Sequence, residues 1–89
     1  MELDLLVAGL QNVMVVESKR RIRPDDPALF LEKLGRLKEF FPEYASHRIF
    51  PVLASINIDP RIIANMNRKK IYALAFADET MELVNLNQF

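Results

Sequence analysis

The fold is decided by an N-terminal stretch, residues 2–21, which reads ELDLLVAGLQNVMVVESKRR. Two runs rich in apolar and β-branched residues, 2–8 and 13–21, lie on either side of the segment 9–12. That short segment begins with glycine and ends with asparagine, the residue types that tight turns favour. The pattern predicts a β-hairpin.

The register of this hairpin follows from its loop. A two-residue loop at 10–11 and a four-residue loop at 9–12 both place Ala8 opposite Val13. Counting back along the ladder, we expect Asp4 to face Glu17. Because side chains alternate, one face of the hairpin should carry Glu2, Asp4, Leu6, Ala8, Val13, Val15, Glu17 and Lys19. The other face, with Leu3, Leu5, Val7, Met14 and Val16, is expected to pack under a helix.

Downstream, apolar periodicity and proline punctuation predict the remaining elements. They are a helix capped by Asp25 or Asp26 and ending near Phe41, a strand at 48–57, a helix at 60–69, a strand at 71–77 and a strand at 80–86. The order is β-β-α-β-α-β-β, which predicts an α/β fold with a mixed sheet and flanking helices. The βαβ connection should be right-handed. With 89 residues, the chain should form one domain, 1–89.

Composition narrows the classes of function. Lys and Arg together number 12, as do Asp and Glu, so the net charge is zero. This argues against a protein surface that is basic overall and binds nucleic acid through its general charge. There is no cysteine, hence no disulfide framework and no thiolate metal site. No apolar run approaches the roughly 20 residues of a membrane span, and no basic segment precedes the first apolar run as in a signal peptide. We therefore expect a cytoplasmic protein.

Two facing carboxylates make the end of the hairpin a candidate site. Asp4 opposite Glu17 is unfavourable alone, because like charges across a strand pair repel. A cation between them removes the conflict, and Mg²⁺ prefers such oxygen ligands. Lys19, one pleat beyond Glu17, could hold a water or a phosphate. The alternative is a solvated hairpin end with a Glu2–Lys19 ion pair contributing under about 1 kcal/mol.

The segments Leu3-Asp4-Leu5-Leu6-Val7 and Val13-Met14-Val15-Val16-Glu17-Ser18-Lys19 resemble the D…E-x-K signature of the PD-(D/E)XK, or restriction-endonuclease-like, nuclease superfamily. The similarity extends through Phe40-Phe41-Pro42-Glu43-Tyr44 and Ile49–Ala54, and looks like an uncharacterised prokaryotic branch. It implies Mg²⁺-dependent hydrolysis of phosphodiester bonds in DNA or RNA. Asp4, Glu17 and the Ser18 carbonyl would bind the metal, and Lys19 would orient the attacking water.

The resemblance also has departures. The family core usually starts with one more helix and strand, both absent here, and Glu2 would stand in for the lost acid. The strand at 2–8 is then an uncovered sheet edge, which natural proteins normally pair or cover. We therefore expect a homodimer, or a partner subunit, closing that N-terminal edge. The alternative function is a catalytically degenerate nuclease-fold module that serves as a dimeric binding or assembly domain.

Basic residues follow the candidate site. Arg20, Arg21 and Arg23 read either as phosphate contacts or as solvated charge at a strand end. His47, the only histidine, is expected to be a surface residue rather than a catalytic base.

Overall fold

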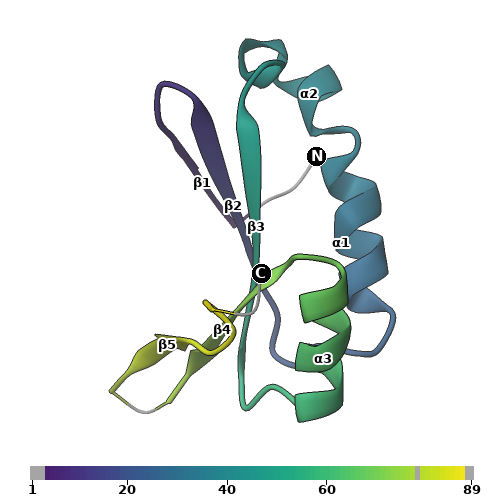
Figure 1. Cartoon of the computed structure of the whole chain (residues 1–89), viewed down its shortest axis with the longest axis vertical. Coiled ribbons are helices and arrows are strands. Elements are labelled where there is room, and N and C mark those ends of the chain that lie inside the picture. The colour runs from purple at the N-terminus through teal and green to yellow at the C-terminus, as the bar shows by residue number, and fades with distance from the viewer. Residues whose placement is uncertain (1–3, 78, 88–89) are drawn as a thin grey trace.

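A computed structural model describes residues 4–77 and 79–87 of the chain. One five-stranded sheet runs in the spatial order β1-β2-β3-β4-β5, the same as the order in sequence (Figure 1). The strands are β1 (Leu5–Ala8), β2 (Asn12–Ser18), β3 (Arg48–Ile56), β4 (Tyr72–Phe76) and β5 (Met81–Leu83). The helices are α1 (Asp26–Leu34), the short α2 (Leu37–Phe40), the 3₁₀ turn η1 (Pro42–Tyr44) and α3 (Pro60–Arg68).

The sheet is mixed. β2, β3 and β4 run parallel to one another, whereas β1 and β5 are antiparallel to their neighbours. Parallel neighbours need a crossover connection. α1, α2 and η1 lie in the crossover from β2 to β3, and α3 lies in the crossover from β3 to β4. The predicted mixed α/β fold is therefore confirmed.

The register predicted for the first hairpin is confirmed from Leu5 to Ala8, but the expected pair of Asp4 with Glu17 is not part of the ladder. Ala8 pairs with Val13 and Leu6 with Val15, and the ladder ends at Leu5. Asp4 lies just beyond that last pair and outside β1. The predicted strand began at residue 2; residues 2 and 3 lie outside the described part of the chain, so the expected contacts of Glu2 and the position of Leu3 do too.

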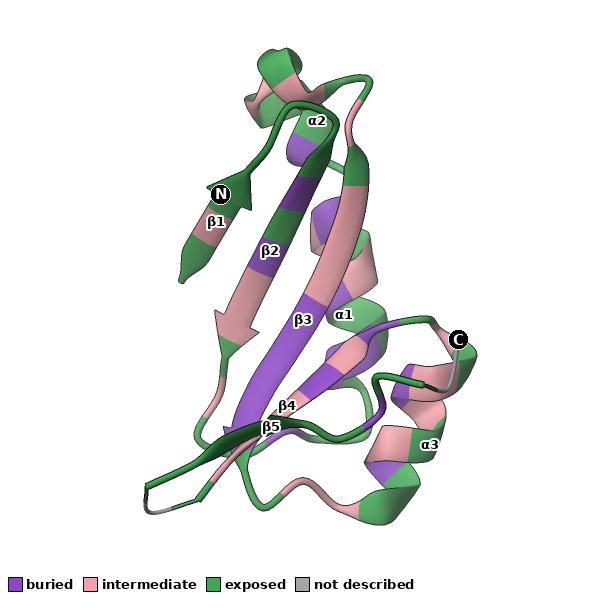
Figure 2. Cartoon of the chain, turned by 60° about the vertical axis from the view of Figure 1, so that its left-hand side comes forward, coloured by how far each residue is buried: buried purple, intermediate pink, exposed green. Residues whose placement is uncertain are grey.

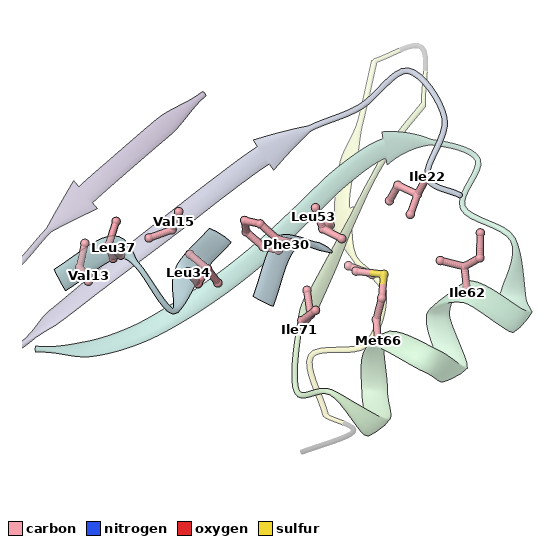
Figure 3. Close-up of a cluster of buried hydrophobic side chains, with 11 residues drawn as sticks. Val13, Val15, Ile22, Phe30, Leu34, Leu37, Leu53, Ile62, Met66 and Ile71 are labelled. Carbon is pink, nitrogen blue, oxygen red and sulfur yellow. The ribbon is translucent and has the colours of Figure 1, made fainter. Parts of the chain in front are cut away.

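Both long helices pack against the same face of the sheet (Figures 1 and 2). The core between them is apolar (Figure 3), and its buried members are Val13, Val15, Ile22, Phe30, Leu34, Leu37, Leu53, Ile62, Met66, Ile71 and Ala73. Burying these side chains supplies most of the free energy of folding, at about 25 cal/mol per Å² of apolar surface.

The hairpin face predicted to pack under a helix is the wrong one. Val13 and Val15 are fully buried against the helices, whereas Leu5, Val7 and Met14 on the opposite face are about half exposed. The reason is that alternation assigns side chains to two faces of the hairpin without showing which face becomes buried. Which face is covered depends on the direction in which the crossover chain leaves the sheet.

The single helix predicted up to Phe41 is interrupted at Gly35. There the Gly35 N–H still bonds the Leu31 carbonyl, but the Arg36 N–H bonds Lys33, one residue closer, as in a 3₁₀ turn. This tightening places both Leu34 and Leu37 in the core. A continuous helix would also bring residues three apart to one face, so periodicity alone does not reveal the break.

β2 is shorter than the predicted strand, which ran to residue 21. The last ladder bond runs from the Lys19 N–H to the Ala54 carbonyl, at 2.9 Å. Beyond it, the Ser55 hydroxyl donates to the Arg20 carbonyl at 3.1 Å, and Ile22 turns into the core. The segment 20–25 is therefore an anchored loop at the carboxyl end of the sheet.

The last strand ends at Leu83 rather than Leu86 because the Asn85 side chain continues the edge of the sheet in its place. Its Oδ1 accepts the Ala73 N–H at 2.8 Å, and its Nδ2 donates to the Ile71 carbonyl at 2.9 Å and to Asn67 at 2.8 Å. Asn85 is 1% exposed, so these backbone groups have no water to replace it.

We expect Asn85→Ala to lower the free energy of unfolding by about 2–4 kcal/mol, because two buried backbone groups lose their partner. Urea denaturation measures this change, and amide exchange at Ala73 should accelerate. Asn87→Ala, on the same segment but exposed, is the matched control and should stay within about 0.5 kcal/mol of the parent. Equal effects of the two substitutions would contradict the role given to Asn85.

Candidate active site

Glu17 stands on the helix-covered face of β2, next to the carboxyl end of the strand. It shares this face with Val15 and Val13, two and four residues earlier. Its carboxylate forms an ion pair and hydrogen bond with Lys33, which projects from the last turn of α1. The Glu17 side chain is only 14% exposed, so its charge is stabilised chiefly by this ammonium.

Lys19 lies one pleat further on and is held by the start of α1. Its Nζ is 3.6 Å from Oδ1 of Asp26. The other Asp26 oxygen accepts the Arg23 N–H at 2.6 Å, so this buried carboxylate is fixed from two directions. Asp26 sits in the first turn of α1, where the helix dipole also favours a negative charge.

Asp4 turns its carboxylate toward the other strand of the hairpin. Oδ2 accepts hydrogen bonds from the Ser18 backbone N–H and from the Ser18 hydroxyl, the latter at 2.9 Å. These bonds hold the pKa of Asp4 below its ordinary value of 3.8, with smaller contributions from the charges of Lys33 and Lys19. Asp4 is therefore ionised at neutral pH.

The three residues predicted from sequence thus lie at one end of the hairpin, each with its own partner. Asp4 is bonded to Ser18, Glu17 to Lys33 and Lys19 to Asp26. A cation was expected between Asp4 and Glu17; in the structure Asp4 bonds Ser18, and the chain itself supplies a cation to Glu17. The Lys33 ammonium contacts Glu17 directly and also acts electrostatically on Asp4.

Sequence reasoning missed Lys33 and Asp26 as members of this cluster. Asp26 was predicted only as a possible helix cap, and Lys33 was not among the predicted site residues. A signal was present in Lys33, because it directly precedes Leu34 and lies three residues after Phe30, so it borders the apolar stripe of α1. A charged side chain at such a border lies close enough to the sheet to meet a charge on it.

The cluster lines a cleft of about 350 Å³ between β2 and α1. Its walls include Glu17, Lys19, Asp26, Phe30 and Lys33. Within residues 4–77 and 79–87, no three acidic, histidine or cysteine side chains form a group that could cage a metal. Mg²⁺ does not require one, since it is usually held by one or two carboxylates with water and substrate phosphate. The oxygen donors of Asp4, Glu17 and Ser18 fit that ion chemically.

The three arginines considered as phosphate contacts follow β2, but they do not all line the same pocket. Arg21 and Arg23 line a second crevice, which shares no lining residue with the cleft. Arg20 is exposed and anchored through its carbonyl. His47 is half-buried rather than on the surface: its Nε2 lies 3.0 Å from the Gly9 carbonyl, and its ring meets Tyr44 edge-on. This histidine therefore ties the hairpin turn to η1.

Comparison of the chain with protein-family models, with curated proteins and with solved structures gives no match. Among the described residues, no helix has the length and apolar character needed to cross a membrane.

We expect the stability difference between the parent and Asp4→Asn to depend on pH. The folded-state pKa of Asp4 lies below 3.8, so its ionised form stabilises the fold above that pH, and the contribution is lost as pH falls through the depressed pKa. Urea denaturation at pH 7 should show a less stable variant, and the difference should shrink below pH 3.8. A difference that is constant from pH 7 to pH 2 would contradict the Ser18 interaction as its source.

Proposed function

We propose that this chain is a Mg²⁺-dependent hydrolase of phosphodiester bonds in DNA or RNA, built on a restriction-endonuclease-like core. The observation that carries the proposal is the grouping of Asp4, Glu17 and Lys19 at one end of the first hairpin, beside a cleft. The spacing of these residues along the chain agrees with the D…E-x-K signature. Glu17 and Lys19 line the cleft and Asp4 lies on the neighbouring strand of the hairpin, and two acids with a lysine are the groups that such a reaction requires.

In this proposal, Asp4, Glu17 and the Ser18 carbonyl hold the ion, which when bound lowers the pKa of a coordinated water and offsets phosphate charge. Lys19 donates hydrogen bonds to the attacking water or to a phosphate oxygen. The ion pair with Asp26 uses only part of the hydrogen-bonding capacity of Lys19, because an ammonium has three N–H donors. Hydrolysis then joins the water oxygen to phosphorus, and the sugar oxygen departs and gains a proton.

Lys33 has a distinct part in this scheme. Its ammonium satisfies Glu17 and lowers the pKa of Asp4, so it competes with a metal ion for both carboxylates. Binding of Mg²⁺ therefore has to displace Lys33 from Glu17. The exposed fraction of the Lys33 side chain, 32%, leaves it a path toward solvent.

We expect millimolar Mg²⁺ or Mn²⁺ to raise the melting temperature, since a ligand that binds only the folded state stabilises it. Asp4→Ala and Glu17→Ala should abolish the shift. Lys33→Met should enlarge it, because the competing ammonium is gone. Labelled DNA or RNA should be cut by the parent and at least about 100-fold more slowly by Lys19→Ala.

Lys38→Ala is the matched control, because Lys38 is exposed on α2, away from the cluster. It should leave both the metal shift and the cleavage rate unchanged. Absence of a metal-dependent shift at millimolar concentration would count against the proposal. Cleavage that survives Lys19→Ala would point to a contaminating nuclease.

A second candidate function, an assembly domain, is favoured by the uncovered face of the sheet (Figure 2). All described helices lie on the other side. The register directs fifteen uncharged strand side chains to this face, and the only charged one is Arg48 at the end of β3. Several large apolar residues are exposed there, namely Leu5, Val7, Met14, Ile56, Met81 and Leu83.

The occupant that best fits this face is a second copy of the chain. The face is almost free of charge, so it offers little to select an acidic or basic partner, whereas two identical apolar faces are complementary. At about 4.8 Å between strands and 3.3 Å per residue, it covers roughly 450 Å² in projection. With side chains standing above that plane, two copies reach the roughly 1,200 Å² at the lower end of stable interfaces.

We expect the chain to sediment as a dimer at about 100 μM. Ile56→Glu and Met81→Glu should each raise the dissociation constant at least about 10-fold, because a charge would be desolvated in the interface. Leu10→Glu is the control: Leu10 is 98% exposed, but it sits in the hairpin turn. A monomeric parent at this concentration, or a dimer insensitive to both face substitutions, would contradict the assembly function.

A further inference from the structure

A crevice of about 790 Å³ opens beyond the carboxyl ends of β2 and β3. One wall is the loop 21–25 that follows β2, and the other is the segment 57–65, which contains the start of α3. Loops that follow parallel strands commonly form ligand sites, although the strand order β2-β3-β4 does not reverse here as it does in doubly wound folds. The volume lies within the range typical of small-ligand sites.

Three guanidinium groups line this crevice, from Arg21, Arg23 and Arg61. Arg61 is engaged by Asp59, with Nη2 3.0 Å from Oδ2, and Asp59 also caps α3 by accepting the Arg61 N–H. Within the described part of the chain, neither Arg21 nor Arg23 forms an ion pair. Asp25 and Asp59 also line the crevice, and Asp59 acts electrostatically on Arg21, so three guanidinium groups against two carboxylates leave the crevice with a net positive charge.

The backbone that carries these two arginines is fixed on both sides. Ile22, between them in sequence, is buried in the core at 5% exposure. The Ser55 hydroxyl bonds the Arg20 carbonyl, and the Asn65 amide donates to the Pro24 carbonyl at 3.3 Å. A loop anchored in this way keeps its charged side chains at one location, which lowers the entropic cost of binding.

The crevice and the active-site cleft share this loop. Asp25 lines the crevice, whereas the next residue, Asp26, lines the cleft and holds Lys19. Arg21 follows Lys19 by two residues. A polyanion bound in the crevice would thus extend toward Glu17 and Lys19 without crossing the core.

We propose that this arginine crevice binds backbone phosphates of a single nucleic-acid strand next to the bond that is cut. This inference rests on the proposed nuclease function and adds the site that holds its substrate. Guanidinium groups suit the role because they pair with phosphate oxygens in two parallel hydrogen bonds. The crevice contains no aromatic side chain for stacking bases, so the contact is with phosphate and independent of sequence.

Fluorescence anisotropy with a labelled single-stranded oligonucleotide tests the crevice, in buffer with EDTA so that no metal contributes. The double substitution Arg21→Gln/Arg23→Gln should weaken binding at least about 10-fold. It should also reduce the slope of log K against log salt by about 1.4, since each phosphate contact on a single strand contributes about 0.7. Circular dichroism and the melting temperature show whether the variant is folded; if it is not, Arg23→Lys, which keeps the charge, should retain most of the salt slope.

Arg48→Gln/Arg68→Gln is the matched control, because both arginines are exposed and line neither the crevice nor the cleft. It should leave the affinity within about 2-fold of the parent. Equal loss in both double variants would overturn the proposal. So would binding that is abolished by equimolar inorganic phosphate, which would identify a small-anion site instead.

The same assay separates this inference from the proposed function. Glu17→Gln should bind the oligonucleotide normally and fail to cut it. The protein could bind the strand through Arg21 and Arg23 and never cut it. That result would support the phosphate-binding proposal and contradict the hydrolase proposal. Cleavage that persists in the folded Arg21→Gln/Arg23→Gln variant with unchanged affinity would reject the crevice and retain the hydrolase.

Discussion

The parallel pairing of β2 with β3 is the constraint on which the rest of the structure depends. Its ladder runs from Asn12 opposite Arg48 to Ser18 opposite Ala54. Strands that run parallel cannot be joined by a tight turn, so the chain must cross over the sheet, and the crossover brings α1 against β2. The same pairing sets the carboxyl ends of both strands side by side. Both the candidate active-site cleft and the arginine crevice lie at that end.

The charged side chains at this end of the sheet are stabilised by ion pairs with α1. Glu17 is mostly buried, and an unpaired carboxylate there would be destabilising. Lys33 and Asp26, both on α1, neutralise Glu17 and Lys19 respectively. The pairs therefore fix the position of α1 relative to β2 as well as the charge state of the site. In the proposed function, a metal ion or a phosphate that enters the cleft would have to exchange with these partners.

The one-sided placement of the helices leaves a chemically distinct second surface. The covered face buries the core, whereas the opposite face keeps Leu5, Met14 and Ile56 in contact with water. An exposed sheet face of this kind raises the free energy of the isolated chain in water, and association lowers it. Because the face points away from α1, occupying it leaves both the cleft and the crevice accessible. Assembly and phosphate binding are thus compatible in one molecule.

The sequence by itself determined the hairpin, its register and the order of the elements. Ala8 pairs with Val13 as the turn residues predict, and Pro60 opens α3 behind its Asp59 cap. These features depend on neighbours along the chain or across one short turn, where propensity and steric limits act directly. It also singled out Asp4, Glu17 and Lys19, although their chemistry is a proposal. The partners of these residues, Lys33 and Asp26, were decided only by the tertiary structure, as was the choice of the face that the helices cover. Both depend on the path of the crossover. Alternation and periodicity show which residues share a face of a strand or helix, but they do not show which face packs against which other element.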